Sequence, residues 1–215
     1  MRHVSGSGIR RTAAVVAAAL VAFGAFGAGS ARAGEGLLGL SCGYDPSHPF
    51  LRWLDPLPYV LAPNGGLENG ASGWKLAGGA KVASGNSPFN LSGAGSRSLY
   101  LPAGSSATSP RMCVELTLPV VRFVSKGGGL LTGLKVEGVY TDVFGNEQSL
   151  VLLPGALPSS SWQPTLPLLQ LGGLVNALTL NGTTTEMSFR FTPVGLFGGG
   201  DWYVDEVFVD PWKRT

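Results

Sequence analysis

The sequence predicts an all-β protein: an antiparallel β-sandwich of the jelly-roll type with about eight or nine strands. Short stretches in which apolar and polar residues alternate follow one another from residue 64 onward, and no helical pattern separates them. The 215 residues include 33 glycines and 15 prolines, and only 13% are charged, which is typical of many short strands joined by turns. Strands without intervening helices argue against a parallel sheet, and the turn spacing favours a sandwich.

The first 33 residues have the order of a secretory signal peptide. Basic residues precede an apolar run over 12–27, and the segment 30–33 (Ser-Ala-Arg-Ala) offers small side chains for cleavage after Ala33. A membrane anchor is the alternative, but the run is shorter than the roughly 20 residues that cross a bilayer. The pair Arg10-Arg11 also leaves a twin-arginine signal open. We expect a secreted, extracellular protein with no transmembrane segment after cleavage.

Cleavage would reverse the sign of the net charge. Residues 1–33 contain four arginines and no acidic residue, so their removal changes the formal net charge from +2 to −2. The basic character therefore belongs to the precursor. A domain without a basic surplus argues against nucleic acid as a partner.

We expect residues 34–63 to form an irregular N-terminal arm that packs on the domain, and residues 64–215 to form the β-sandwich. The arm has little periodicity and several prolines, yet it holds apolar residues that could anchor it. The chain has two cysteines, Cys42 in the arm and Cys113 in the domain. In an oxidising compartment such a pair is usually a disulfide, worth about 4 kcal/mol in the chain-entropy model. Two buried thiols are the alternative.

Two segments show the clearest strand patterns. In 134–141, Leu134 and Val136 share a face with Tyr140, while polar residues point the other way. The segment 202–210 is apolar on both faces and should be a central strand.

Other segments predict turns and edges. The stretches 74–77 and 80–83 flank Gly78-Gly79, which predicts a hairpin. The stretch 162–168 is interrupted by prolines and suits an edge strand. The apolar stretch 168–180 could be a short helix, although two glycines interrupt it.

No catalytic constellation stands out. From residue 34 onward the sole histidine is His48, and no nucleophile pattern accompanies it; one histidine and two bridged cysteines do not build a usual zinc site. The glycine runs 127–129 and 198–200 lack the Lys-Ser/Thr of a phosphate loop, and we interpret them as hairpin turns. No carboxylate pair is placed to face across a sugar. We expect a protein that is not an enzyme and requires no cofactor.

Two motifs carry a resemblance to a known family. The domain opens with 64–68 (Asn-Gly-Gly-Leu-Glu) and 73–74 (Gly-Trp), and closes with 202–209 (Trp-Tyr-Val-Asp-Glu-Val-Phe-Val). This pair resembles the jelly-roll carbohydrate-binding modules of the galactose-binding-like group. The middle of the chain is similar to a group of secreted actinobacterial proteins of unknown function, through Thr108-Ser109-Pro110, Met112-Cys113-Val114, Arg122-Phe123, Ser161-Trp162-Gln163-Pro164-Thr165 and Phe189-Arg190-Phe191-Thr192-Pro193.

The first resemblance implies a possible structural Ca²⁺. Glu68 and Asp205 match the positions from which such modules supply carboxylates, and Ca²⁺ needs several oxygen ligands. Leu67 in place of the usual Phe, and Glu206 in place of a second Asp, depart from the family pattern. The alternative is that Glu68 caps a turn and Asp205 accepts backbone hydrogen bonds.

A glycan site needs aromatic faces beside polar groups. The candidates for the aromatic part are Tyr140 and Trp162, with Phe144 nearby, and those for the polar part are Arg122, Glu137 and Arg190. Core packing and surface ion pairs are the alternative for each of them. Trp74 and Trp202 are expected in the core.

The sequence thus predicts a secreted, non-catalytic binding module whose expected ligand is an extracellular or cell-wall glycan. The alternative is a structural or protein-interaction domain of the cell envelope or extracellular space, suggested by the low charge and by apolar stretches such as 168–174. Exposure of Tyr140 and Trp162 together on one concave sheet would favour the first hypothesis.

Overall fold

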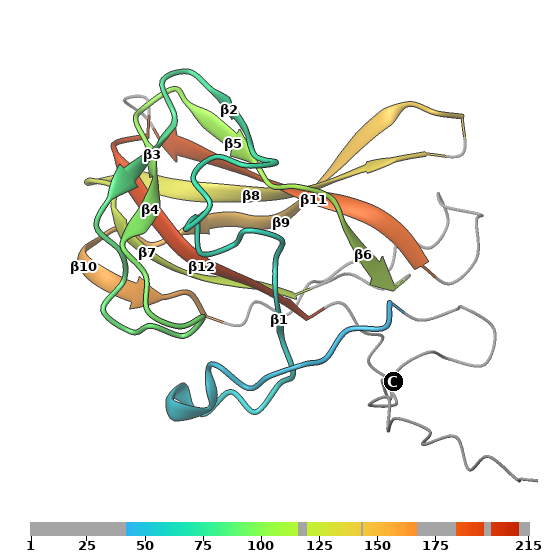
Figure 1. The fold of residues 1–215 in the computed structure, drawn as a ribbon. Coiled ribbons are helices and arrows are strands. Elements are labelled where there is room, and N and C mark those ends of the chain that lie inside the picture. Colours follow the sequence, from blue (N-terminus) through green and yellow to red (C-terminus); the bar gives the residue numbers. More distant parts are fainter. Residues whose placement is uncertain (1–41, 116–119, 143, 167–183, 196–198, 211–215) are drawn as a thin grey trace, which may run out of the picture. The chain divides into compact units, whose positions relative to one another are not determined.

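The computed structural model describes residues 42–115, 120–142, 144–166, 184–195 and 199–210 (Figure 1). Within them the chain forms one turn of 3-10 helix, η1 (Leu51–Trp53), and twelve strands. The strands are β1 (Val60–Leu61), β2 (Lys75–Ala77), β3 (Lys81–Ser84), β4 (Arg97–Leu101), β5 (Ser106–Thr108), β6 (Met112–Glu115), β7 (Val120–Gly127), β8 (Thr132–Thr141), β9 (Glu147–Ala156), β10 (Ser159–Pro164), β11 (Thr184–Gly195) and β12 (Trp202–Asp210). The predicted signal peptide and the stretch 168–180 lie outside the described residues.

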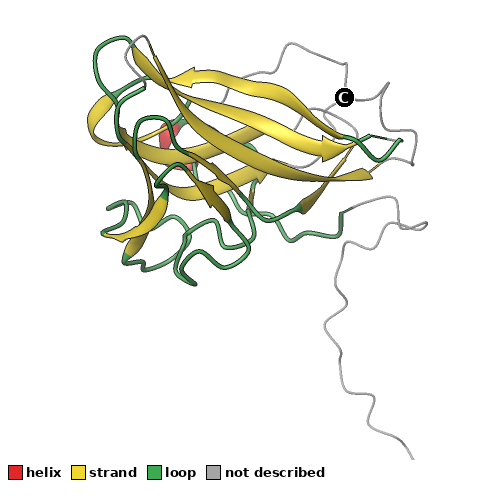
Figure 2. Cartoon of the chain, turned by 90° about the horizontal axis from the view of Figure 1, so that it is seen from above, coloured by secondary structure: helices red, strands yellow, loops and turns green. Residues whose placement is uncertain are grey.

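The strands form two antiparallel sheets, which confirms the predicted jelly-roll β-sandwich. Sheet I has the order β10-β7-β12-β4-β3, with β1 also paired to β12; sheet II has the order β2-β5-β11-β8-β9, with β6 also paired to β11. Figure 2 shows strands and loops almost throughout, with η1 the single helical element of the described residues. None of these residues form a helix of the length and apolar character that a membrane span needs. Strands exceed the predicted eight or nine because several, such as β1 and β5, are too short for alternation to show.

The two clearest sequence patterns are confirmed. In β8, Leu134, Val136 and Tyr140 are buried in the core between the sheets, while Lys135 and Glu137 lie on the outer face and form an ion pair of 3.1 Å. Strand β12 is central in sheet I, because it pairs with β7 on one side and with β4 and β1 on the other. Strand β10 lies at the edge of sheet I, as its prolines predicted.

Both predicted core tryptophans are buried. Trp202 is fully buried and its indole N–H donates to the carbonyl oxygen of Gly199 at 2.9 Å. Trp74 is 7% exposed, and its indole N–H donates to the carbonyl oxygen of Asn64 at 3.1 Å. Each ring thus enters the core without leaving its N–H unpaired.

The predicted glycine hairpins are wrong. Gly78 and Gly79 join β2 in sheet II to β3 in sheet I, so this turn connects the two sheets. Both have positive φ, and a Cβ on Gly78 would lie 2.7 Å from the carbonyl oxygen of Gly104. Of the other two runs, Gly128 and Gly129 likewise join β7 in sheet I to β8 in sheet II, and the described Gly199 and Gly200 lead into β12 of sheet I from β11 of sheet II. A glycine run marks a sharp change of direction, but it does not say whether the next strand stays in the same sheet.

The part of the arm around η1 packs on the outer face of sheet I. Phe50 and Tyr59 are fully buried, and their ring centroids lie 5.2 Å apart, edge to face. Phe50 also contacts Phe208 of β12 at 5.6 Å. Since Val207 and Val209 point into the core, Phe208 between them points outward, and the arm covers it.

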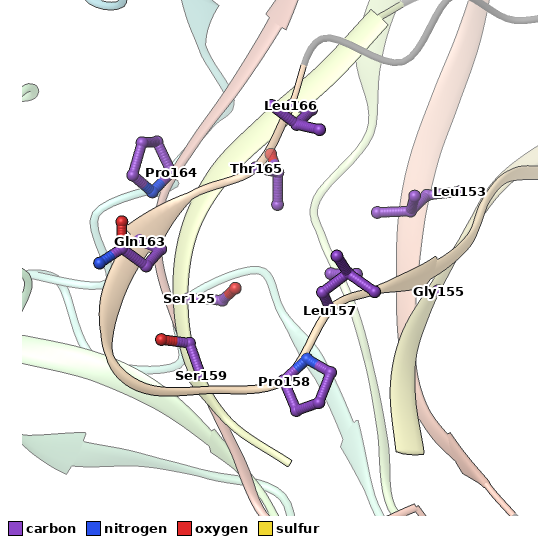
Figure 3. Close-up of a pocket in the computed structure, with 11 residues that line it drawn as sticks. Ser125, Leu153, Gly155, Leu157, Pro158, Ser159, Gln163, Pro164, Thr165 and Leu166 are labelled. Atoms are coloured by element: carbon purple, nitrogen blue, oxygen red, sulfur yellow. The ribbon is translucent and has the colours of Figure 1, made fainter. Parts of the chain in front are cut away.

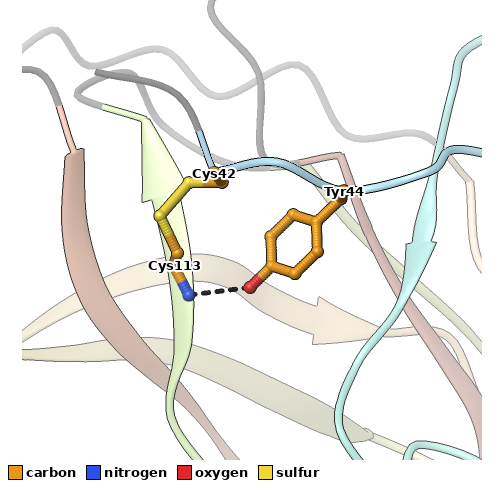
Figure 4. Close-up of a disulfide and its surroundings, with 3 residues drawn as sticks. All are labelled: Cys42, Tyr44 and Cys113. Carbon is orange, nitrogen blue, oxygen red and sulfur yellow. Dashed lines mark hydrogen bonds between the residues drawn. A yellow bond between two sulfur atoms is a disulfide. The ribbon is translucent and has the colours of Figure 1, made fainter. Parts of the chain in front are cut away.

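A disulfide joins the arm to sheet II, as predicted. Cys42 and Cys113 are bonded across a sequence separation of 71 residues (Figure 4). The backbone N–H of Cys113 donates to the Tyr44 hydroxyl oxygen at 3.0 Å, so the tyrosine supports the same attachment. Burial raises the pKa of the Tyr44 hydroxyl.

Candidate functional site

A row of aromatic and cationic side chains crosses the outer face of sheet I. The strand register places Lys126 of β7 opposite Tyr203 of β12, Tyr203 opposite Tyr100 of β4, and Tyr100 opposite Lys81 of β3. Trp162 of the edge strand β10 contacts Tyr203 and Lys126, and so extends the row. We call these five residues the aromatic row.

Alternation along the strands explains why these side chains point outward. Trp202 and Val204 flank Tyr203 and are both fully buried in the core, so Tyr203 faces the other side. Leu99 and Leu101 flank Tyr100 in the same way. The three rings of the row are half-buried, which leaves part of each ring in contact with solvent.

The rings and ammonium groups of the row are in direct contact. The ring centroids of Tyr100 and Tyr203 are 5.1 Å apart, and those of Tyr203 and Trp162 are 6.4 Å apart. Lys126 Nζ lies 4.9 Å from the centroids of both Trp162 and Tyr203, and Lys81 Nζ lies 5.4 Å from that of Tyr100. These distances are within the range of a cation–π interaction.

Asp201 fixes one end of the row. The Tyr100 hydroxyl donates to Asp201 Oδ2 at 2.8 Å, and the N–H of Ala103 donates to Oδ1 at 3.3 Å. The hydrogen bond to this carboxylate raises the pKa of Tyr100, because it holds the phenolic proton in place. The position of the Tyr100 ring is therefore set by packing on one side and by a charged acceptor on the other.

Beyond Tyr203, the outer face of β12 is covered. Beyond Tyr203, the outward positions of β12 are Asp205, Phe208 and Asp210, which are 3%, 2% and 2% exposed. The arm covers Phe208, and the loop 85–96 covers Asp205. These covering segments leave the aromatic row open to solvent.

The residues predicted for the glycan site do not come together. Trp162 belongs to the aromatic row, but Tyr140 lies on sheet II and is 4% exposed, within the core. It shares the inward face of β8 with Leu134 and Val136, so the alternation that identified this strand also explains its burial. The predicted platform of Tyr140 and Trp162 on one face is therefore wrong.

The predicted polar residues are occupied elsewhere. Arg122 is 2% exposed and pairs with Asp55 of the arm at 2.5 Å. Glu137 and Arg190 are in register on the outer face of sheet II, where Glu137 pairs with Lys135. Arg190 pairs with Glu147 at 2.7 Å. None of the three polar residues belongs to the aromatic row. Phe144 is 85% exposed in the turn between β8 and β9 and is also outside it.

Two adjacent buried carboxylates anchor the loop 85–96. Asp205 Oδ2 accepts the N–H of Ser87 and Oδ1 accepts the N–H of Glu206, both at 2.7 Å. Glu206, whose φ is 53° at a bulge in β12, accepts hydrogen bonds from the Ser87 hydroxyl and from the N–H of Leu91. Burial, with a further contribution from the neighbouring Glu206 charge, raises the pKa of Asp205 to about 7.

The two carboxylates implied as calcium ligands both accept backbone hydrogen bonds, and the calcium site stays a prediction. Glu68 Oε1 accepts the N–H groups of Ser96 and Arg97 at 2.8 and 2.9 Å, which lowers its pKa. Both Asp205 oxygens also face N–H donors, whereas Ca²⁺ takes six to eight oxygen ligands. In the part of the chain that the structure describes, no three His, Cys, Asp or Glu side chains gather to hold a metal. Their observed roles are those of the alternative: Glu68 fastens a turn and Asp205 accepts backbone hydrogen bonds.

A separate cavity of about 430 Å³ opens where β10 approaches β9 (Figure 3). Its lining is largely aliphatic and includes Leu153, Ala156, Leu157, Pro158, Pro164 and Leu166. Leu157 and Leu166 are 83% and 70% exposed. The described residues of its lining include no aromatic side chain, so they do not offer the stacking surface that the aromatic row provides.

Solved carbohydrate-binding modules are among the structures to which the chain is similar, each with a TM-score below 0.5. No family model and no curated protein matches the chain. The CBM22-1 xylan-binding domain of Xyn10C from Paenibacillus barcinonensis is 13% identical, with a TM-score of 0.45, over 66% of this chain and 88% of that one. The family 11 carbohydrate-binding module from Clostridium thermocellum, in complex with a β-1,3-1,4-mixed-linked tetrasaccharide, is 12% identical, with a TM-score of 0.37, over 74% and 99%. TmCBM61, in complex with β-1,4-galactotriose, is 19% identical, with a TM-score of 0.39, over 71% and 98%.

Proposed function

We propose that the protein is a secreted, non-catalytic module that binds an extracellular or cell-wall glycan through the aromatic row. The observation that carries the proposal is the row itself. Trp162, Tyr203 and Tyr100 come from three strands and are open to solvent on one face, while the arm and the loop 85–96 cover the neighbouring outward positions of β12. Because these exposed rings contact one another across strands, they form one continuous patch. A continuous exposed patch of this kind marks a binding site, whereas single exposed aromatic residues do not.

The chemistry of the row suits a sugar. The C–H face of a pyranose stacks on an aromatic ring, and its hydroxyls need donors and acceptors at the edge of that ring. Asp201 and the ammonium groups of Lys126 and Lys81 lie at the ring edges and faces and supply both kinds of partner. Neighbouring strands are about 4.8 Å apart, so rings on adjacent strands offer a linear series of contacts to an extended chain.

A polysaccharide pull-down tests this proposal. The purified protein should bind at least one plant or cell-wall polysaccharide, and Tyr203→Ala and Trp162→Ala should each weaken that binding about tenfold, which corresponds to about 1.4 kcal/mol. Phe144→Ala is the matched control, because Phe144 is an exposed aromatic outside the row. Absence of binding to every polysaccharide, or equal effects of all three substitutions, would contradict the proposal.

A protein-interaction role is a second candidate. The exposed Leu157 and Leu166 at the aliphatic cavity favour it, because apolar side chains grouped at a surface mark protein contacts. Size-exclusion chromatography coupled to light scattering would support it if the protein self-associates and Leu157→Ser with Leu166→Ser restores a monomer. A monomeric wild type that binds polysaccharide would favour the first candidate.

A further inference from the structure

The two lysines of the aromatic row occupy the positions at which a sugar ring would stack. Lys126 Nζ is 4.9 Å from the ring centroids of both Trp162 and Tyr203, so one ammonium group serves two aromatic faces. Lys81 Nζ lies 5.4 Å from the Tyr100 ring at the other end of the row. Any sugar that stacks on these rings has to move the ammonium groups aside, but a sugar with an anionic substituent can keep the displaced ammonium groups as charge partners.

In the part of the chain that the structure describes, neither lysine forms an ion pair with a carboxylate. Among the described residues, the ion pairs are Arg122–Asp55, Lys135–Glu137 and Arg190–Glu147, and none of them involves the aromatic row. The nearby Asp201 accepts hydrogen bonds from Tyr100 and Ala103 instead. The positive charge on this face is therefore available to a ligand.

The charge is spaced along the row rather than concentrated at one point. Lys126 and Lys81 lie on β7 and β3, which are separated in sheet I by β12 and β4. Three strand spacings correspond to about 14 Å between their backbones. Tyr203 and Tyr100 lie between the two lysines, so the series is cation, two rings, cation. This series fits an extended chain with charges on separate sugars better than a single small anion.

We infer that the ligand of the aromatic row is an acidic polysaccharide, one whose sugars carry carboxylate or sulfate groups. The inference rests on the proposed function, because it names the class of glycan for the same surface. The chain from residue 34 onward has a formal charge of −2, so the molecule as a whole does not attract an anionic polymer. Selectivity for acidic sugars would have to come from the two lysines of the row.

The experiment compares polymers that differ in charge alone. Polygalacturonate is set against its methyl ester, and dextran sulfate against dextran, in affinity electrophoresis with the purified protein. We expect binding to at least one charged polymer and not to its neutral counterpart. The double variant K81Q/K126Q should bind about tenfold more weakly, and about 1 M NaCl should have a similar effect, because it shortens the Debye length to about 3 Å. Lys75→Gln, which removes one exposed lysine from sheet II, is the control and should bind normally.

The outcomes separate this inference from the proposed function. Equal binding of the charged and neutral polymers that is lost in Tyr203→Ala would overturn the inference and leave the glycan function standing. Binding to a charged polymer that K81Q/K126Q does not weaken would also overturn the inference. Absence of binding to all four polymers and to neutral cell-wall polysaccharides would overturn both. Binding to polygalacturonate alone would assign a carboxylate, and binding to dextran sulfate alone a sulfate.

Discussion

Removal of Asp55 should destabilise the protein more than removal of any exposed charge. The Asp55 carboxylate is 5% exposed and pairs with Arg122, which is 2% exposed, at 2.5 Å. Asp55→Ala would leave the guanidinium buried without its counter-charge. Breaking a buried ion pair by removing one partner costs about 3–5 kcal/mol.

The other hydrogen bonds of Asp55 favour a cost in the upper half of this range of about 3–5 kcal/mol. Asp55 also accepts the Tyr59 hydroxyl at 2.7 Å and the N–H of Leu57 at 3.1 Å, and each lost hydrogen bond costs about 1 kcal/mol. Arg122 would retain its hydrogen bond to the carbonyl oxygen of Thr165, at 2.8 Å, but this neutral acceptor does not compensate a full charge. We expect the free energy of unfolding to fall by about 4 kcal/mol, with release of the arm from sheet I.

Urea denaturation followed by tryptophan fluorescence measures this loss. The double variant Asp55→Ala/Arg122→Met should be more stable than Asp55→Ala alone, because it no longer buries an unpaired charge. Glu137→Gln breaks the more exposed pair with Lys135 and serves as the control, with an expected loss of about 1 kcal/mol or less. The reasoning is refuted if Asp55→Ala costs less than about 1 kcal/mol, or if the two substitutions of the double variant are additive.

Three further predictions concern the disulfide, pH and export. Replacing Cys42 and Cys113 by Ser should lower the free energy of unfolding by about 4 kcal/mol, since the bond closes a loop of 71 residues; urea denaturation of the variant would show it. Native Asp205 binds a proton up to about pH 7, whereas the unfolded side chain releases it near pH 4, so the free energy of unfolding should fall as pH rises from about 4 to about 7. The change is up to about 4 kcal/mol, and Asp205→Asn should remove it from urea curves measured across this range. Export from a bacterial host should yield a protein that begins at Gly34, after cleavage behind Ala33; intact mass and N-terminal sequencing would reveal an uncleaved or differently cleaved chain.

Alternation and composition were enough to predict the layers of the fold. The apolar face of β8 could be assigned because that strand is long enough for period two to be visible, and β12 could be predicted as central because it is apolar on both faces. The disulfide followed from an even cysteine pair in a chain that we expect to be exported. Assignment of strands to sheets was not predictable in the same way. Gly78-Gly79 has the composition of a hairpin turn, and only the pairing of β2 with β5 and of β3 with β4 shows that it connects the sheets.

The aromatic row depends on contacts that are distant in sequence. Tyr100 and Tyr203 were each predictable as outward-facing, since core residues flank both, but their contact requires the register of β4 with β12. Arg122 is the opposite case, a residue for which alternation predicts the wrong exposure. A charged residue that alternates outward on β7 should be exposed, yet it is buried because the arm brings Asp55 over it. Sequence alternation therefore gives the face of a side chain, whereas the covering segments decide whether that face reaches solvent.

The covered and open parts of sheet I have opposite physical requirements. The covered part buries ionisable groups, and these have partners within the protein, as Arg122 has in Asp55 and Asp205 has in the N–H of Ser87. In the open part, the lysine charges face aromatic rings and keep capacity for a further partner. The rings are held by core strands and by the Tyr100–Asp201 hydrogen bond, so little side-chain entropy is lost when a ligand lies across them. A rigid row with unused charge is the arrangement that a binding surface needs, and it arises here because the arm and the loop 85–96 end before they reach it.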